Sequence, residues 1–93
     1  MTVTVHISIS EGENTYHSEI VVEDSALKDV RFAFNPSGLK SVAELKTLAA
    51  ALITKANEVA RTGAEGAGRS CATARTMAQN ASFWAVHGAT EGL

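Results

Sequence analysis

The chain has 93 residues, of which 45% are hydrophobic, 5% aromatic and 19% charged, and its formal net charge at pH 7 is −2. These values predict one folded domain over residues 1–93 with a thin aliphatic core. They exclude a disordered chain and argue against binding to DNA or RNA polymers, which requires a strongly basic surface. The one cysteine, Cys71, excludes a disulfide within the chain, and neither a signal peptide nor a membrane-spanning run is recognisable, so we expect a cytoplasmic protein without membrane contact.

The N-terminal third is predicted to contain a β-hairpin. Apolar and polar residues alternate over residues 3–10, which indicates a strand, and Glu11-Gly12-Glu13-Asn14 suits a tight two-residue turn. Residues 15–22 are the second predicted strand. If Gly12 and Glu13 form the turn, then Val5 faces Ile20 and Ile9 faces Tyr16, so that apolar side chains meet across the strands.

A third strand is predicted before the first break in the pattern. Residues 23–29 are polar and are expected to form a loop, whereas Val30, Phe32 and Phe34 alternate with other residues over 30–34. Residues 1–35 therefore form the sheet part in this prediction, with about three antiparallel strands. The run 35–38, Asn-Pro-Ser-Gly, then interrupts the chain.

Two long helices are predicted to follow. Ser41 and Glu44 have the spacing of a capping box, apolar residues recur every three to four positions up to residue 60, and Gly63 is a natural stop. A second helix is expected from about residues 66–69 to about Thr90. The short link makes residues 41–90 an antiparallel helical hairpin, so the expected fold class is α+β.

The second helix has one face of small residues. Such a face buries little area by itself, and we therefore expect other copies of the chain to pack against it. Trp84, the only tryptophan, is read as a packing anchor rather than as a ligand platform. The small face comprises Ala67, Cys71, Ala74, Ala78, Ala81, Ala85, Gly88 and Ala89.

Catalytic and metal-binding chemistry finds little support in the residues. In the predicted hairpin His6 lies opposite Glu19 with His17 diagonal to it, which is a possible ligand set for iron or zinc, although solvated cross-strand pairs are the favoured interpretation. Cys71 has no histidine at helical spacing and is read as a helix-packing residue. No paired carboxylates in an apolar setting and no phosphate-binding loop are present.

Arginines are the better candidates for a binding site. Arg61 and Arg69 flank the link between the two helices, and arginine is the preferred side chain for binding phosphate through two parallel hydrogen bonds. Phe34 next to Asn35 could stack on a nucleobase and hydrogen-bond to its edge. A solvated surface for the arginines and a core position for Phe34 are the alternatives left open by the pattern.

Four stretches of the chain together carry a family resemblance: Asn35-Pro36-Ser37-Gly38; residues 45–53, Leu-Lys-Thr-Leu-Ala-Ala-Ala-Leu-Ile; Arg69 with Ala72, Ala74 and Thr76; and residues 81–90, which include Trp84-Ala85-Val86. They resemble the helical-hairpin domain shared by two phage anti-defence families, Thoeris anti-defence protein one and anti-CBASS protein two. The sheet that precedes the hairpin is similar to the Thoeris family. His87 departs from the basic residue expected after Trp-Ala-Val.

The resemblance implies a phage-encoded sponge rather than an enzyme. Such proteins bind cyclic nucleotide immune messengers, namely glycocyclic ADP-ribose and cyclic di- and trinucleotides, and assemble as homohexamers with pockets between protomers. No cofactor and no metal are implied. The site residues that we expect on this basis are Arg31, Phe34, Asn35, Arg69, Thr73 and Arg75.

Two other functions remain open at this point. An oligomeric structural or interaction module would use the same helical hairpin without binding nucleotides. A metal-dependent enzyme would be built on His6, His17 and Glu19.

Overall fold

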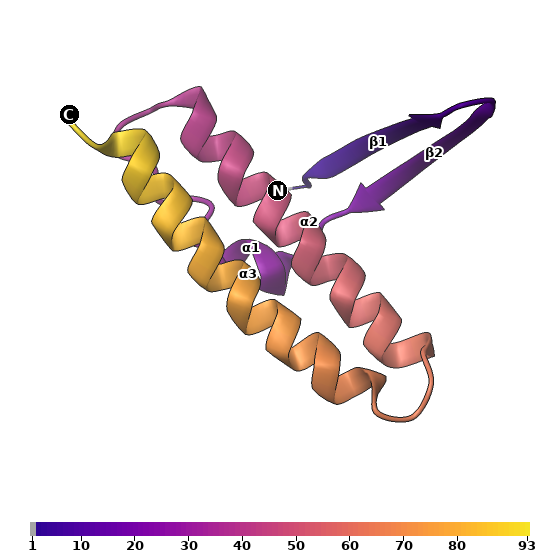
Figure 1. Cartoon of the computed structure of the whole chain (residues 1–93). Coiled ribbons are helices and arrows are strands. Elements are labelled where there is room, and N and C mark those ends of the chain that lie inside the picture. Colours follow the sequence, from indigo (N-terminus) through magenta and orange to yellow (C-terminus); the bar gives the residue numbers. More distant parts are fainter. Residues whose placement is uncertain (1) are drawn as a thin grey trace.

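The structure, a computed structural model, describes residues 2–93 and confirms the α+β class and the helical hairpin. A two-stranded antiparallel hairpin is followed by a short helix and two long antiparallel helices (Figure 1). Within the described residues no helix combines the length and the apolar character that crossing a bilayer demands. The elements are β1 Thr4–Glu11, β2 Asn14–Val21, α1 Asp24–Asp29, α2 Lys40–Thr62 and α3 Ala67–Thr90.

The β-hairpin has the predicted register and projects from the helices as an arm (Figure 1). Val5 pairs with Ile20 and Ile9 with Tyr16, and Gly12 adopts the positive φ of +57° that the tight turn requires. The base of the arm packs on the helical core through Val5 and Ile20, which are half-buried. Towards the tip the same face is open, because 50% of Ile9 and 55% of Tyr16 are exposed.

The predicted third strand is wrong. Residues 24–29, expected as a loop, form helix α1, and residues 30–33 form the turn that ends it. The reason is that Ala26, Leu27 and Val30 have helical spacing and are all buried, while the N–H of Val30 donates to the carbonyl of Ala26 at 3.2 Å. A five-residue alternation does not distinguish a strand from the end of a helix. The sheet therefore has two strands, not three.

The start of α2 also differs from the prediction, because the Ser41–Glu44 capping box does not form. The helix begins at Lys40, one residue before Ser41, and its N-cap residue Leu39 makes no side-chain capping bond. The preceding break supplies the local hydrogen bonds instead. The Oγ of Ser37 accepts from the N–H of Leu39 at 3.4 Å, and the Nδ2 of Asn35 donates to the Leu39 carbonyl at 3.2 Å. Gly63 ends α2 as predicted.

The small face of α3 packs against α2 within the same chain. Ala78 and Ser82 are buried at the centre of this contact, and Ala74 and Ala85 are half-buried beside them, whereas Ala81 and Gly88 are exposed. Helix α1 lies against the hairpin and contributes Ala26 and Leu27 to the same core. The small residues that were expected to contact other copies are therefore largely used for close approach of the two helices.

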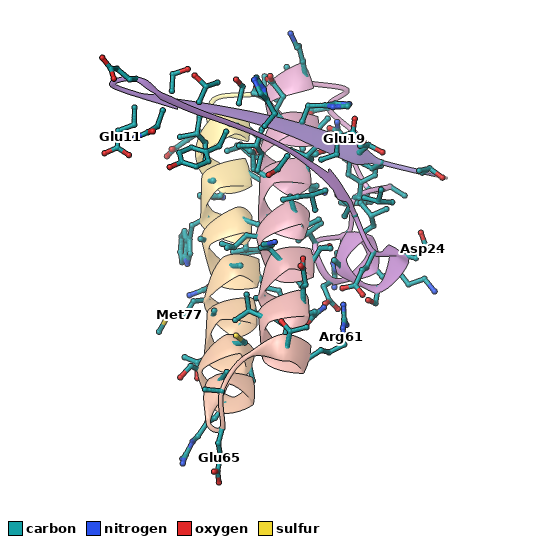
Figure 2. All side chains as sticks on the ribbon, turned by 90° about the vertical axis from the view of Figure 1, so that its right-hand side faces the viewer. Glu11, Glu19, Asp24, Arg61, Glu65 and Met77 are labelled. Carbon is teal, nitrogen blue, oxygen red and sulfur yellow. The ribbon has the colours of Figure 1, made fainter. Side chains whose placement is uncertain are left out.

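A different surface is left open. We call it the open helical face, and it consists of large apolar side chains from both long helices that are 43–66% exposed. On α3, Met77 projects on the side opposite α1 and Arg61 (Figure 2). On α2, Leu48, Leu52 and Val59 recur at helical spacing, as do Met77 and Trp84 on α3, and an exposed apolar stripe of this kind is typical of an interaction site. The residues of this face are Leu48, Leu52, Val59, Met77 and Trp84.

Candidate functional site

A groove with a volume of about 440 Å³ lies between the α1–α2 connection and the C-terminal half of α3. We call it the Arg31 groove. The turn that ends α1 lies against α2, where Lys46 is bonded to Arg31 and Phe34. The groove is the space that remains between this turn and the side of α3. It is lined by Asp29, Val30, Arg31, Phe34, Lys46, Gln79, Ser82, Phe83, Val86, His87 and Thr90.

Lys46 of helix α2 holds the α1–α2 connection in place through hydrogen bonds to its backbone. Only 6% of this residue is exposed, yet its ammonium is satisfied because it donates to the carbonyl of Arg31 at 2.8 Å and to the carbonyl of Phe34. The same ammonium lies 5.7 Å from the centre of the Phe34 ring, within range of a cation–π contact. Lys46 thereby fixes the backbone of Arg31 and Phe34, which are two of the residues that line the groove.

Burial lowers the pKa of Lys46 below its usual value, and the nearby Arg31 guanidinium lowers it further. Both effects disfavour the charged ammonium. The two charge-assisted hydrogen bonds to backbone carbonyls act in the opposite direction, because they favour the charged form.

Arg31 itself is held in an unusual backbone conformation. Its φ of +53° is the only positive φ of a residue other than glycine among residues 2–93. In this conformation its N–H donates to the carbonyl of Lys28 at 3.0 Å, which ends α1. The left-handed region is strained for a residue with a Cβ and is found preferentially at functional sites.

The groove combines cationic and aromatic groups. Arg31 and His87 present hydrogen-bond donors on its lining, the buried ammonium of Lys46 adds a positive charge beneath them, and Asp29 is the one carboxylate of the lining. The rings of Phe34 and Phe83 are 64% and 66% exposed, so both can be covered by a ligand. This arrangement suits a flat ring that carries an anionic group, because guanidinium binds phosphate and aromatic side chains stack on bases.

The structure brings together only some of the six residues that were expected to bind a ligand. Arg31 and Phe34 line the groove. Asn35 follows directly, but its side chain is used locally, since its Oδ1 accepts from Ser37 at 3.0 Å and its Nδ2 donates to Leu39.

The three residues expected from α3 do not reach the groove within one chain. Arg69 and Thr73 are exposed in the first two turns of α3, where the Thr73 hydroxyl donates to the Arg69 carbonyl at 3.3 Å. Arg75 donates to the Oδ1 of Asn57 at 2.7 Å, and Asn57 donates in turn to the Glu23 carboxylate at 2.8 Å. Arg75 therefore ties α3 to α2 and to the start of α1.

Sequence reasoning missed Lys46, Phe83 and His87. Lys46 lies at a core position of α2, one helical turn from the buried Val42 and Ala50, and a lysine at such a position was a usable signal. Phe83 and His87 are one turn apart on α3 and share a face. Their position near Arg31 depends on the turn that ends α1, and the predicted strand over residues 30–34 did not include this turn.

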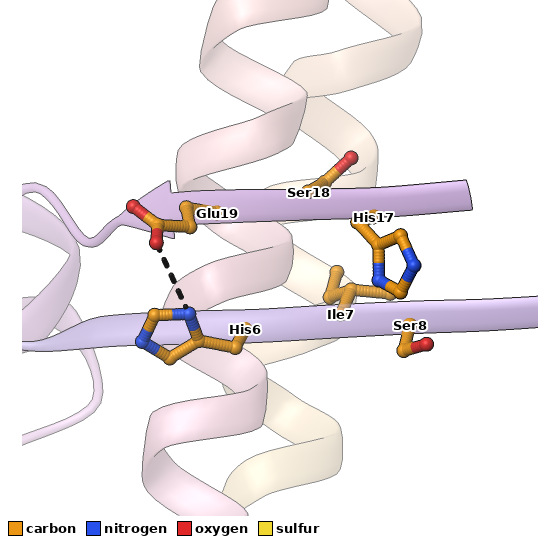
Figure 3. A pocket seen from close by; sticks show the side chains of 6 residues that line it. All are labelled: His6, Ile7, Ser8, His17, Ser18 and Glu19. Carbon is orange, nitrogen blue, oxygen red and sulfur yellow. Dashed lines mark ion pairs between the residues drawn. The ribbon is translucent and has the colours of Figure 1, made fainter.

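The histidines of the arm do not assemble a metal site. His6 Nδ1 lies 3.3 Å from Glu19 Oε1, as the register predicts, but both side chains are about two-thirds exposed. The two imidazole rings lie at opposite ends of a shallow depression (Figure 3). Among residues 2–93 no three side chains of histidine, cysteine, aspartate or glutamate are placed to hold a metal ion. The favoured interpretation as a solvated cross-strand pair fits this geometry.

The chain was compared with known proteins in three ways. Protein-family models, curated proteins and solved structures yield no match.

Proposed function

We propose that this protein is a non-enzymatic sponge that binds cyclic nucleotide messengers in the Arg31 groove and holds them away from their receptors. The observation that carries the proposal is the joint presence of Arg31, Lys46 and His87 beside two exposed phenyl rings in a groove of about 440 Å³. That volume lies within the range of small-molecule pockets. Cyclic nucleotides carry both the phosphates and the bases that such a lining recognises.

The sequence resemblance supplies the choice of messenger. It implies glycocyclic ADP-ribose and cyclic di- and trinucleotides, and so a phage protein that blocks Thoeris or CBASS signalling. Sequestration needs tight binding and abundance, and it requires no catalytic group.

The proposal includes self-association, with a homohexamer as the expected assembly. The open helical face supports it, because five large apolar side chains on one face lack cover within the chain. Phe83 and Trp84 are adjacent and both more than 60% exposed, so the C-terminal half of α3 presents apolar surface in two directions. Contacts between copies would bury these side chains and could complete the groove.

A melting scan against a panel of cyclic nucleotides, with linear mononucleotides as controls, tests the proposal. A ligand that binds the folded state raises the transition temperature. The affinity of each hit is then measured by calorimetry for Arg31→Ala and for Arg69→Ala. Arg69→Ala is the control, because it removes an exposed arginine side chain that lies outside the groove. Loss of affinity in Arg31→Ala alone supports the groove, whereas equal affinity in both variants would exclude it.

A structural module without a ligand is the second candidate, because the open helical face favours self-association whether or not a nucleotide binds. It predicts a stable oligomer and no thermal shift with any member of the panel. Tight binding of one cyclic nucleotide would rule it out.

A further inference from the structure

The arm formed by β1 and β2 is incomplete as an isolated sheet. Two strands alone are marginally stable in water, and the arm gains little from the helices, since most of its residues are exposed. Ile9, Tyr16 and Val21 are each at least half exposed. The outer edge of β2 carries no proline, no lysine and no bulge, which are the usual devices that protect a free edge from pairing.

The hydrogen-bond pattern defines which residues of β2 point outward. The N–H of Val22 donates to the carbonyl of Val3 at 2.8 Å, so this pair is hydrogen-bonded. Hydrogen-bonded and non-hydrogen-bonded pairs alternate along an antiparallel ladder, and Ile20, Ser18 and Tyr16 therefore also bond inward to β1. The backbone groups of the residues between them are directed to the free edge. These residues are Thr15, His17, Glu19 and Val21.

This edge is complementary to itself. We propose that β2 pairs antiparallel with β2 of a second copy about a twofold axis at Ser18, which joins the two arms into a four-stranded sheet. In this register His17 faces Glu19 of the second copy, and the same pair forms again on the other side of the axis. Tyr16 faces Ile20 of the second copy on the opposite face, so that partly exposed apolar side chains meet.

The charges on the polar face of the arm favour a second copy of the chain as the partner of β2. The Glu19 carboxylate already lies 3.3 Å from the His6 imidazole within the chain, whereas His17 makes no ion pair among residues 2–93. Figure 3 shows Glu19 and His17 on the same strand, with the His17 ring away from the His6–Glu19 pair. The twofold register places each free imidazole opposite a carboxylate, and cross-strand pairs of opposite charge stabilise a sheet.

The edge of β1 offers no comparable match. By the same alternation its outward residues include Thr4, His6 and Ser8, and none of them is acidic. Pairing two β1 strands would therefore bring no opposite charges together in the stretch that faces outward. The second copy is thus expected on β2.

Cysteine crosslinking tests the register directly. In a non-hydrogen-bonded pair the two Ser18 Cα atoms would lie about 4.5 Å apart, which a disulfide can bridge. In a full-length Cys71→Ala background, Ser18→Cys is expected to give a covalent dimer on mild oxidation. Thr15→Cys is the matched control, because the two Thr15 residues would lie roughly 20 Å apart along the strands and should give none. Equal crosslinking of both variants, or none with Ser18→Cys, would overturn the proposal.

A charge exchange in the same Ser18→Cys background provides the second measurement. His17→Glu places two carboxylates opposite each other, and Glu19→Lys places a cation opposite His17, so each variant alone should lose the crosslink. An equimolar mixture should restore it as a mixed dimer, which mass spectrometry identifies, because glutamate at position 17 then faces lysine at position 19. Failure of the mixture to crosslink more than either variant alone would refute the register.

Discussion

Replacing Arg31 with glycine is expected to change stability and ligand binding in opposite directions. The residue has a φ of +53°, a conformation that costs a residue with a Cβ about 1–2 kcal/mol and costs glycine almost nothing. Glycine adds backbone freedom to the unfolded chain, which offsets roughly 0.5–1 kcal/mol of that gain. The substitution also removes the positive charge that lowers the pKa of Lys46. Arg31→Gly should therefore stabilise the fold by about 0.5–1 kcal/mol, a rise of several degrees in Tm.

Binding should weaken in the same variant. Loss of a hydrogen bond between guanidinium and phosphate costs about 1.5–3 kcal/mol, which corresponds to an increase in Kd of roughly 10- to 150-fold. Thermal unfolding and calorimetry are measured on the same preparations, with Arg31→Ala as the control that removes the guanidinium but keeps the strained φ. An Arg31→Gly protein that melts no higher than Arg31→Ala would refute the argument from strain, and unchanged affinity would remove Arg31 from the site.

Three further predictions follow from the same geometry. Phe83→Ala should weaken nucleotide binding by about 1–3 kcal/mol through loss of stacking on an exposed ring, and calorimetry that finds no change would place the base elsewhere. The pKa of Lys46 is lowered in the folded state, so the unfolded chain binds more protons between that lowered pKa and 10.5. Chemical unfolding should therefore show that the free energy of unfolding rises with pH in this window relative to Lys46→Met. The same pH dependence in both proteins would contradict the argument. Trp84→Glu should reduce the assembly size in sedimentation velocity, because it places a carboxylate on the open helical face, whereas Lys28→Glu, on an exposed side chain of α1 away from that face, serves as the control.

The sequence predicted the hairpin register and the two long helices well, because each depends on a long, regular pattern. The alternation over residues 3–10 and the glycine of the turn define the pairing of Val5 with Ile20, and the recurrence of apolar residues up to Gly63 defines α2. Short segments failed. Residues 24–29 were predicted as a loop because they are mostly polar, and the alternation over residues 30–34 matched a strand. The structure instead has the short helix α1 and a turn there, with Ala26 and Leu27 buried.

The candidate site was only partly accessible from sequence for a related reason. Arg31 and Phe34 were found as residue types suited to phosphate and base, but their neighbours Lys46 and His87 come from α2 and α3. How close Arg31 lies to these two helices is determined by the turn that ends α1. The hydrogen bond of the Arg75 guanidinium to Asn57 at 2.7 Å was not predicted, because nothing in the local pattern indicates it.

The ammonium of Lys46 makes the backbone of the α1–α2 connection depend on helix α2. Because one buried cation is bonded to two carbonyls of a segment without regular secondary structure, the shape of this wall of the Arg31 groove is determined by a rigid helix more than by the segment's own side chains. Substitution of the exposed side chains on this segment is therefore expected to change the chemistry of the groove while the backbone keeps its form.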